Sequence, residues 1–545
     1  NWGNAQTGYY VSSEVTWLGN RYGDKTLSAA RMNGLEDRNI LAHPYDLLYY
    51  EPEKLDTDFL PTLDKTFGRT ESVGMFSALR DSNALYVGLK GGYNNDVHNA
   101  LSTGAFVLDA LGERWAWLIG QEDYSVPGYW NYSENGQRWT YYRMRAEAQN
   151  ALVINPGDKP DQYPFGYSKI EKFESKPRGA YAIIDATPAF ATDNKVKKVR
   201  RGAFLTENRT KVIIQDEIEA TNSNYYFMMQ TQADIQIQPD GKTAILERNG
   251  KKMFVELQST NPDAKFATMD AVPLSTSPHP EQNSPNNGVR KLVVNVKNTN
   301  DLTVSVIFTP LANKQSNITS AKMVGMDNWE IPDGDLKAMQ LESLTVDGKT
   351  IEGFAPNRTD YKLFLPHDYP DTIPEVVATS EFETTVTLPK ELPGTATVTM
   401  TDAETNRTVI CNILMQREQN IGVKASAVPE PENPPTNTLD YDLETRWAAE
   451  GEQWIEYDLK EPAQLESVSI AWASGNARKA IFDIEVSVDG ENWTKVWGGE
   501  SSGATLDFEE FSFNAVQAQY VKIVCHGNSV SKWNSINEIQ FKYKK

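Results

Sequence analysis

Residues 91–117, GGYNNDVHNALSTGAFVLDALGERWAW, combine a polar turn with the start of a long series of strand patterns. The second half of this stretch alternates apolar and aromatic residues between short turns, which is the pattern of β-strands. Its first half is a turn rich in glycine and asparagine that contains His98, one of only five histidines in the chain. A histidine in such a turn either caps the local backbone or stands at the mouth of a site and transfers protons. Both interpretations remain open from these residues alone.

Strand patterns continue on both sides of this stretch, from about residue 56 to residue 310. They are short, rich in β-branched and aromatic residues, and separated by Gly, Asn, Asp and Pro. Clear examples are GAYAIIDAT at 179–187, KVIIQDEIEA at 211–220 and LTVSVIFTP at 302–310. Because no helical period intervenes, the sequence predicts a mainly β protein with a large antiparallel β-sandwich over residues 56–336.

Three further units flank the sandwich. Residues 1–55 are expected to be helical, with Ser12 or Ser13 as an N-cap, Gly23 as a stop and a second helix at 25–33. Two short helices have no core of their own, so we expect the C-terminal end of a helical domain. Residues 337–417 predict a small immunoglobulin- or cadherin-like spacer, and residues 418–545 a last all-β domain.

The composition excludes several classes of function. With 545 residues and a net charge of −21, the chain lacks the excess of Lys and Arg that nucleic-acid binding requires. Cys411 and Cys525 are the two cysteines, so neither a disulfide framework nor a CxxC metal site is expected. No stretch approaches the roughly 20 apolar residues of a membrane helix. The chain begins at Asn1 without signal-peptide features, so we expect a piece of a longer product.

Several motifs in order resemble one enzyme family. GLKGGYNNDVHNALSTGAFVLDALGERWAWLIGQEDY at 88–124 and NGQRWTYYRMRAEAQNALVINP at 135–156 resemble the β-sandwich half of heparinase II/III-type polysaccharide lyases. WLGNRYGD at 17–24 and LLYYEPE at 47–53 are similar to the end of that family's (α/α) toroid. The resemblance covers about residues 10–310 and implies cleavage of a uronate-containing polysaccharide, such as a glycosaminoglycan, by β-elimination.

The resemblance also implies a set of catalytic and substrate-binding residues. His98 falls on the position of the family's sandwich-borne catalytic histidine, and imidazole suits proton transfer near neutral pH. Around it, Asn95 is a neutral donor for the carboxylate, Arg138 a bidentate partner for a uronate, and Gln149 a further candidate. The basic run 195–201 includes Lys198 and Arg201, which would hold an anionic chain, although such alternating charges more often form a solvated strand face.

The sequence departs from the family at the positions that hold a metal in some members. Ala100, Leu118 and Gln149 stand where the family has His, Asp and His, and Ser102 replaces an acidic residue. Ala, Leu and Gln cannot build a tetrahedral zinc site, so we expect no metal in the large sandwich. The family's catalytic tyrosine comes from the toroid, and the matching stretch would precede residue 1. The missing toroid part is therefore an expected partner of this chain.

The C-terminal unit resembles discoidin-type (F5/8 type C-like) carbohydrate-binding modules. The resemblance rests on LDYDLETRW at 439–447, FDIEVSVDGENW at 482–493, QYVKIVC at 519–525 and INEIQF at 536–541. It implies a structural calcium ion with hard oxygen ligands. The expected ligands are Asp440, Asp442, Thr445, Glu538 and the carbonyl of Asn437. An Asx-turn without an ion is the alternative. Sugar contacts are expected from Trp533, His526, Asn476 and Arg478.

Three functional hypotheses follow. The first is a secreted, periplasmic or cell-surface bacterial lyase that acts on an acidic polysaccharide or oligosaccharide and carries its own binding module. The second is a glycoside hydrolase on the same scaffold, for which Asp96, Glu122 and Asp123 are the local carboxylates. The third is a noncatalytic carbohydrate-binding protein. We favour the lyase.

Overall fold

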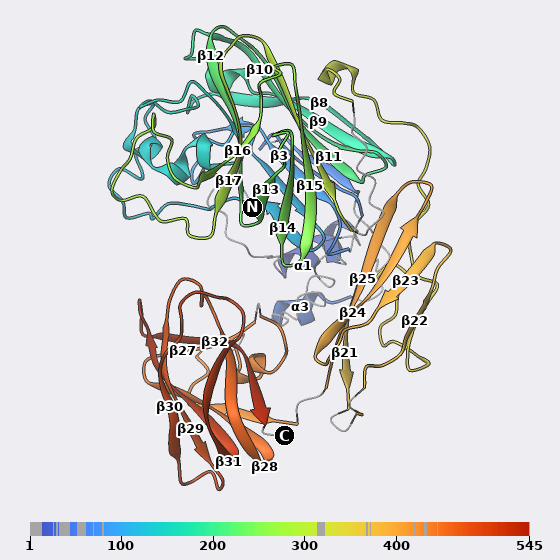
Figure 1. The fold of residues 1–545 in the computed structure, drawn as a ribbon, viewed down its shortest axis with the longest axis vertical. Helices are drawn as coiled ribbons and strands as arrows, with labels where there is room; N and C mark the ends of the chain where they lie inside the picture. Colours follow the sequence, from blue (N-terminus) through green and yellow to red (C-terminus); the bar gives the residue numbers. More distant parts are fainter. Residues whose placement is uncertain are drawn as a thin grey trace. The chain divides into compact units, whose positions relative to one another are not determined.

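The computed structural model describes most of the chain. The described residues are 13–24, 27–28, 31, 44–51, 62–68, 70–78, 81–312, 322–366, 369–370, 372–417, 420–429, 433–443 and 445–543. They form two compact units: the described parts of Asp58–Leu363 and Thr372–Met415 belong to the first, and those of Val11–Thr57, Phe364–Asp371 and Gln416–Lys545 to the second. Antiparallel strands dominate both units, which confirms the mainly β prediction (Figure 1).

Two short helices are described near the N-terminus, α1 (Glu14–Tyr22) and α3 (Pro44–Tyr49). Gly23 ends α1 in the left-handed conformation, with φ 68°, as its position predicted. Asn20 Nδ2 donates to the carbonyl of Tyr49 at 2.7 Å and so links the two helices. The second predicted helix, 25–33, lies largely outside the described residues. Within 13–51 an (α/α) toroid is not evident, so this part of the predicted fold class is not seen.

The first unit contains the large sandwich, which is built from three antiparallel sheets. The five-stranded sheet has the order β1 (Asp64–Phe67), β2 (Ser72–Phe76), β3 (Tyr86–Lys90), β5 (Phe106–Ala110) and β6 (Glu113–Ala116). The nine-stranded sheet has the order β13 (Asp234–Ile237), β14 (Thr243–Arg248), β15 (Lys251–Ser259), β18 (Leu302–Pro310), β11 (Lys211–Ala220), β10 (Val196–Thr206), β9 (Gly179–Asp185), β8 (Tyr167–Lys176) and β4 (Gly92–Tyr93). The third sheet has the order β16 (Phe266–Asp270), β17 (Arg290–Thr299), β12 (Ser223–Thr231) and β7 (Leu152–Ile154).

One hydrophobic core joins the three sheets. Leu89 and Phe106 enter it from the five-stranded sheet, Ile184 and Leu205 from the nine-stranded sheet, and Phe227 from the third. Each such buried side chain contributes about 1.5–3 kcal/mol relative to an exposed one. The core therefore fixes β3 and β5, and the chain between them contains β4 and the turn that carries His98.

The opposite face of the nine-stranded sheet is covered as well. Met326 in the 3₁₀ helix η6 (Met326–Asn328), together with Trp329 and Ile331, packs on Phe204 of β10 and its neighbours. Gly202 makes room for this cover, because a Cβ there would lie 2.5 Å from the Trp329 ring. Consequently β10 is buried at nearly every position from residue 199 to 205, on both of its faces.

Between residues 343 and 417 the chain forms two small sheets with a core of their own. One has the order β20 (Lys349–Thr350), β19 (Ser343–Val346) and β22 (Val376–Thr379). The other has the order β21 (Asp360–Leu365), β25 (Arg407–Arg417), β24 (Gly394–Asp402) and β23 (Glu383–Thr387). Cys411 is buried in this core, and burial raises the pKa of its thiol to about 12.

The strands of the second unit form one continuous sheet around a separate core. They are β26 (Gly422–Ala425), β27 (Trp447–Glu450), β28 (Gln453–Trp472), β29 (Ala480–Ser487), β30 (Thr494–Glu500), β31 (Glu509–Asn528) and β32 (Trp533–Tyr543). β28 and β31 are 20 residues long and change register at irregular points, which lets each pair with several neighbours. No helix in the described part of the chain is long and apolar enough to cross a membrane.

Candidate functional site

The turn that carries His98 is held by buried amide side chains. Asn94 Oδ1 accepts from the backbone N–H groups of Ser102 at 3.0 Å and Thr103 at 3.1 Å. Asn99 Nδ2 donates to the carbonyl of Tyr93 at 2.7 Å. His98 itself is exposed and has φ 64°, in the left-handed region that residues other than glycine seldom occupy. Such backbone strain persists only where the surroundings impose it, and it often marks a functional position.

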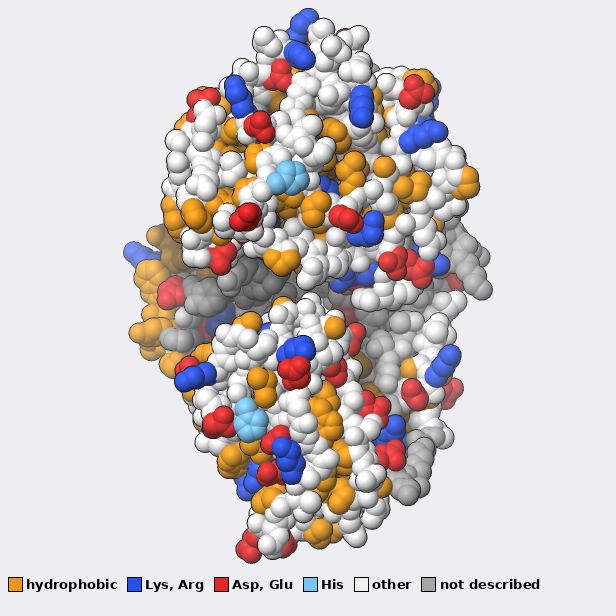
Figure 2. All heavy atoms as spheres, turned by 60° about the vertical axis from the view of Figure 1, so that its left-hand side comes forward, with side chains coloured by type: hydrophobic (Ala, Val, Ile, Leu, Met, Phe, Trp, Pro, Cys, Tyr) orange, Lys and Arg blue, Asp and Glu red, His pale blue; other side chains and the backbone are white. Residues whose placement is uncertain are grey.

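Aromatic side chains from the segment after β6 surround His98. The Tyr124 hydroxyl lies 3.2 Å from Nδ1 of His98, and the Trp130 ring meets the imidazole edge-on with the centroids 5.5 Å apart. The backbone N–H of His98 donates to the Tyr132 hydroxyl at 3.1 Å. Tyr124 is 38% exposed and Trp130 52%, so both rings reach the surface beside the histidine. Figure 2 shows hydrophobic side chains in small groups on the surface of this unit.

Tyr124 is hydrogen-bonded to both His98 and Gln121. Its hydroxyl lies 3.2 Å from His98 Nδ1 and 3.2 Å from Gln121 Oε1. In the tautomer that carries the imidazole proton on Nδ1, this proton is donated to the Tyr124 hydroxyl and the lone pair of a neutral His98 is on Nε2. That is the tautomer in which Nε2 can act as a general base.

Arg138 supports the turn and does not contact the surface. It is fully buried, and its Nη1 and Nη2 donate to the carbonyls of Tyr129 at 2.8 Å and Asn99 at 2.6 Å. Its guanidinium lies 4.2 Å from the ring centroid of Tyr129 and 4.5 Å from that of Tyr132. Arg138 therefore positions the residues beside His98, in place of the uronate contact expected from the sequence.

Two other predicted site residues, Gln149 and Arg201, are also buried inside the sandwich. Gln149 is buried and donates to the carbonyl of Arg143 at 2.6 Å. Arg201 is fully buried in a bidentate ion pair with Asp216, with both distances 2.6 Å, and also donates to the carbonyl of Gly104 at 2.8 Å. Its charge is thus neutralised inside the sandwich and is not presented to a polysaccharide.

The remaining predicted residues of the sandwich lie nearer the surface. Lys198 is exposed on β10, beside a groove that Arg200, Glu217 and Asp327 also line. Arg200 forms ion pairs with Glu217 and Asp327, so this groove has mixed charge. Asn95 follows directly after the buried Asn94, and its Oδ1 is buried without a hydrogen-bond partner among the described residues.

A buried lysine lies under the same turn. Lys90 Nζ donates to Ser102 Oγ at 2.8 Å, and burial lowers the pKa of this ammonium to about 8. Ser102 stands where the resembling family has an acidic residue. The buried charge here is therefore a cation with a neutral hydroxyl partner. Sequence patterns did not single out Lys90.

Two of the three local carboxylates, Glu122 and Asp123, are engaged in holding loops. Glu122 is 1% exposed and accepts from the backbone N–H and the hydroxyl of Ser284. Asp123 accepts from the N–H and the hydroxyl of Ser125, each at 2.7 Å. A glycosidase needs two carboxyl groups that face the scissile bond. Glu122 and Asp123 do not provide such a pair.

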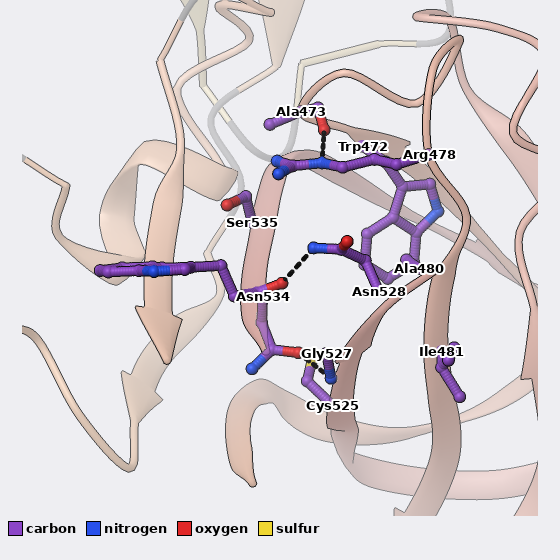
Figure 3. A pocket seen from close by; sticks show the side chains of 11 residues that line it. Trp472, Ala473, Arg478, Ala480, Ile481, Cys525, Gly527, Asn528, Asn534 and Ser535 are labelled. Carbon is purple, nitrogen blue, oxygen red and sulfur yellow. Dashed lines mark hydrogen bonds between the residues drawn. The ribbon is translucent and has the colours of Figure 1, made fainter. Parts of the chain in front are cut away.

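The second unit contains a small pocket between β28, β29, β31 and β32, shown in Figure 3. Its lining residues are Trp472, Ala473, Arg478, Ala480, Ile481, Cys525, Gly527, Asn528, Trp533, Asn534 and Ser535. Two of the predicted sugar-binding residues, Trp533 and Arg478, are thus brought together. Asn528 joins them, because its Nδ2 donates to the carbonyl of Trp533 at 2.7 Å.

Two other predicted sugar contacts lie outside this pocket. His526 Nδ1 is 2.6 Å from Glu452 Oε2, and Nε2 is 3.4 Å from Asp483 Oδ2. Burial alone would lower the pKa of His526, but hydrogen bonds to these two carboxylates raise it overall. Asn476 is exposed on the loop that carries Arg478 and is not a lining residue.

A cluster of oxygen atoms surrounds Thr445. Its Oγ1 lies 2.9 Å from Asp440 Oδ2, 3.0 Å from the Asp442 carbonyl and 3.3 Å from the Asn437 carbonyl. Glu538 reaches the cluster from β32: its Oε1 accepts from the N–H of Asp442 at 3.3 Å, and its Oε2 is buried without a partner. Burial and the neighbouring Asp440 raise the pKa of Glu538 to about 9.

All five predicted calcium ligands are therefore close together, but Asp442 joins Thr445 through its main-chain oxygen. Among the residues described, no three His, Cys, Asp or Glu side chains converge as a metal site. A cation at this cluster would need the two carbonyls and the hydroxyl in addition to the carboxylates of Asp440 and Glu538. This mixed oxygen set is the kind that calcium accepts.

The comparisons with known proteins agree with this unit's architecture. The F5/8 type C domain family model matches residues 422–539. Residues 422–539 form an F5/8 type C domain. Both the pocket around Arg478 and the oxygen cluster around Thr445 lie inside this F5/8 type C domain.

Three similar solved structures illustrate the extent of the match. The CBM32 of AlyQ in complex with 4,5-unsaturated mannuronic acid is 40% identical, with 23% of this chain and 95% of that chain covered and a TM-score of 0.22. A pectin binding carbohydrate binding module is 35% identical, with 23% and 91% covered. A heparinase III is 14% identical, with 65% of this chain and 46% of that chain covered and a TM-score of 0.39. No curated protein sequence matches the chain.

Proposed function

We propose that this chain is part of a polysaccharide lyase that cleaves a uronate-containing polysaccharide by β-elimination. The observation that carries the proposal is the His98 site. An exposed histidine is held in a left-handed turn, its Nδ1 is bonded to Tyr124, and Trp130 covers its edge. The motifs at 88–124 and 135–156 that resemble heparinase II/III-type lyases coincide with this site. On this proposal α1 and α3 belong to the end of the helical toroid.

The chemistry assigned to His98 is proton abstraction. In β-elimination a base removes the proton α to the uronate carboxylate, and the leaving glycosidic oxygen is protonated. With its proton on Nδ1 and bonded to Tyr124, a neutral His98 presents the Nε2 lone pair to that proton. The rings of Tyr124 and Trp130 offer an apolar surface for a sugar ring. Asn95 remains a candidate neutral donor for the uronate carboxylate.

The F5/8 type C domain would hold the same polysaccharide. Trp533 provides a face for stacking a sugar, and Arg478 provides hydrogen-bond donors in the same pocket. Binding by this domain would keep the catalytic sandwich near its insoluble or dilute substrate. A substrate of this kind is met outside the cell or in the periplasm, so we infer a secreted, periplasmic or cell-surface location.

We further propose that the cluster around Thr445 binds calcium as a structural ion. The buried Oε2 of Glu538, which has no hydrogen-bond partner among the described residues, and the neighbouring Asp440 carboxylate support the proposal, because two neighbouring carboxylates of which one is buried need either a proton or a cation between them. Bound calcium would satisfy both carboxylates and fix the loop 437–445. No role in the elimination is assigned to it.

The experiment is to incubate the complete gene product that carries this sequence with a panel of acidic polysaccharides. The ultraviolet absorbance of the unsaturated uronate and the appearance of reducing ends are both followed. The proposal expects the two signals to rise together. Reducing ends without the absorbance would mean a glycoside hydrolase. Binding without either signal would mean a noncatalytic carbohydrate-binding protein.

A further inference from the structure

Two buried cations lie beneath the turn that carries His98. Lys90 is 6% exposed and Arg138 is fully buried, and among the described residues neither forms an ion pair. The other buried arginines of the sandwich are each paired with a carboxylate: Arg145 with Glu147, Arg200 with Glu217, Arg201 with Asp216 and Arg209 with Asp64. A buried charge without a counterion lowers stability, and such charges are concentrated at functional sites.

Lys90 is the less compensated of the two cations. The guanidinium of Arg138 is enclosed by two backbone carbonyls and by the rings of Tyr129 and Tyr132. The ammonium of Lys90 has the Ser102 hydroxyl at 2.8 Å and, more distantly, its neighbour's carbonyl at 3.4 Å. A neutral hydroxyl does not cancel a positive charge, and in a buried environment the field of that charge is weakly screened.

The field of Lys90 reaches the exposed part of the turn. Ser102 Oγ, which accepts from Lys90, lies 3.2 Å from Asn99 Oδ1, and Asn99 directly follows His98. The negative charge of Asp96, which is exposed two residues before His98, raises the pKa of Lys90 against the larger effect of burial. The two charges therefore interact across the turn without forming an ion pair. An anion bound beside His98 meets the same positive field.

Other charged groups near Lys90 are neutralised or engaged elsewhere. Arg201, which also supports this turn from below, is held by both carboxylate oxygens of Asp216. The carboxylate of Glu71 accepts from the Tyr167 hydroxyl at 3.1 Å. Lys90 is therefore the charge beneath the turn that is still available to act on a bound anion.

We propose that Lys90 stabilises, through the turn, the negative charge that β-elimination builds on the uronate carboxylate beside His98. When His98 takes the proton, the electron pair of the C–H bond moves onto the carboxylate. The carboxylate then carries two negative charges until this pair forms the C=C bond and the C–O bond to the leaving sugar breaks. A fixed cation stabilises that doubly charged species more than the singly charged substrate.

Lys90 does not touch the substrate in this account and acts through its field alone. The inference rests on the proposed lyase function and adds to it a residue that favours an acidic sugar over a neutral one at the position of elimination. It also gives a reason for a buried lysine that lowers the stability of the folded chain.

The test compares wild type and Lys90→Met, each as the complete gene product, by unsaturated-uronate formation between about pH 6 and about pH 9.5. At pH 7 the kcat/KM of Lys90→Met is expected to be about 10- to 30-fold lower, the effect of one charge acting over about 10 Å inside a protein. In wild type kcat/KM should decline above about pH 8, where the buried ammonium loses its proton. Lys90→Met should lack this decline.

Lys169→Met is the control, because it removes the same charge from an exposed position on β8. It should keep both the rate and the alkaline decline. A folded Lys90→Met with the wild-type rate overturns the inference, and so does a slow Lys90→Met that retains the decline, since packing alone would then explain it. A wild-type kcat/KM that stays level to about pH 9.5 overturns it without any variant. Absence of elimination by the wild type overturns the proposed function itself.

Discussion

The Tyr124 hydroxyl lies 3.2 Å from Nδ1 of His98, and it also donates a hydrogen bond to Gln121 Oε1 at 3.2 Å. The contact holds the imidazole by its Nδ1 side. It also comes from the same sandwich as the histidine, from the segment between β6 and the 3₁₀ helix η2 (Gln137–Thr140). His98 and the tyrosine bonded to it therefore come from the same sandwich.

Tyr124→Phe tests this relationship. The substitution keeps the ring and its packing on Trp130 but removes the hydroxyl, so Nδ1 of His98 loses its hydrogen bond to Tyr124. We expect the elimination rate to fall by about 10- to 100-fold, with the thermal midpoint changed little. Rates are measured from unsaturated-uronate absorbance at saturating substrate. Tyr167→Phe is a matched control, because Tyr167 is also 38% exposed and bonds Glu71 elsewhere. Equal rates for wild type and Tyr124→Phe would contradict the assignment.

Arg138→Lys tests the support beneath the turn. Lysine cannot reach both carbonyls that Arg138 satisfies and cannot stack between Tyr129 and Tyr132 in the same way. We expect a loss of about 2–4 kcal/mol of unfolding free energy, together with reduced kcat. Urea unfolding measures the first and steady-state kinetics the second. Arg290→Lys, at an exposed position, should change neither. A fully stable variant that only raises KM would instead show that Arg138 contacts substrate.

Lys90 makes stability depend on pH in the alkaline range. Its pKa falls from 10.5 to about 8 on burial, so unfolding takes up a proton between these values. Below pH 8 the buried ammonium of Lys90 lowers the free energy of unfolding. This destabilisation disappears as pH rises from about 8 to 10.5, so the folded chain becomes more stable over that range. Lys90→Met should be the more stable form at pH 7, by up to about 3 kcal/mol. That advantage should disappear towards pH 10.5.

The check for Lys90 is urea unfolding of wild type and variant at pH 7 and pH 10. Lys169→Met, at an exposed position on β8, is the control and should give the same small difference at both pH values. A difference for Lys90→Met that does not change with pH would mean that the ammonium is not desolvated in the folded chain.

Calcium should stabilise the F5/8 type C domain. If the cluster around Thr445 binds the ion, millimolar calcium raises the unfolding temperature of this domain by several degrees, because only the folded domain has the site. Glu538→Gln should abolish the calcium response, since it replaces a buried carboxylate ligand. Glu491→Gln, at an exposed turn, should keep it. The unfolding temperature is measured by differential scanning calorimetry with calcium and with a chelator. If calcium raised it equally in the wild type and in Glu538→Gln, the site would be refuted.

The strands and turns were predictable from local patterns, but the burial of some of them was not. Short β-branched runs between Gly, Asn and Pro placed most strands of the sandwich and the C-terminal domain. β10 was different: its basic residues suggested a solvated face. In the structure Arg201 is enclosed with Asp216, and Trp329, more than 100 residues away, covers the outside of the sheet. Only tertiary packing creates that environment.

The residues of the candidate site were likewise predictable only in part. His98 was proposed through its turn and the family motifs, and Trp533, Arg478 and the five candidate calcium ligands through the C-terminal motifs. Arg138 was predicted to bind the substrate, because the sequence around an arginine does not show that its guanidinium will be buried against backbone carbonyls. Tyr124 and Trp130 were missed, although the concentration of aromatic residues in YSVPGYWNY at 124–132 was a usable signal.

The central claim is that His98 is the base of a β-elimination. The most direct measurement is the rate of unsaturated-uronate formation by the complete gene product, compared between wild type, His98→Ala and His279→Ala. His279 bonds the carbonyl of Leu274 and is not among the residues around His98, so it controls for the loss of a histidine. The account predicts that His98→Ala abolishes the signal and that His279→Ala keeps it. Undiminished elimination by His98→Ala would contradict the account.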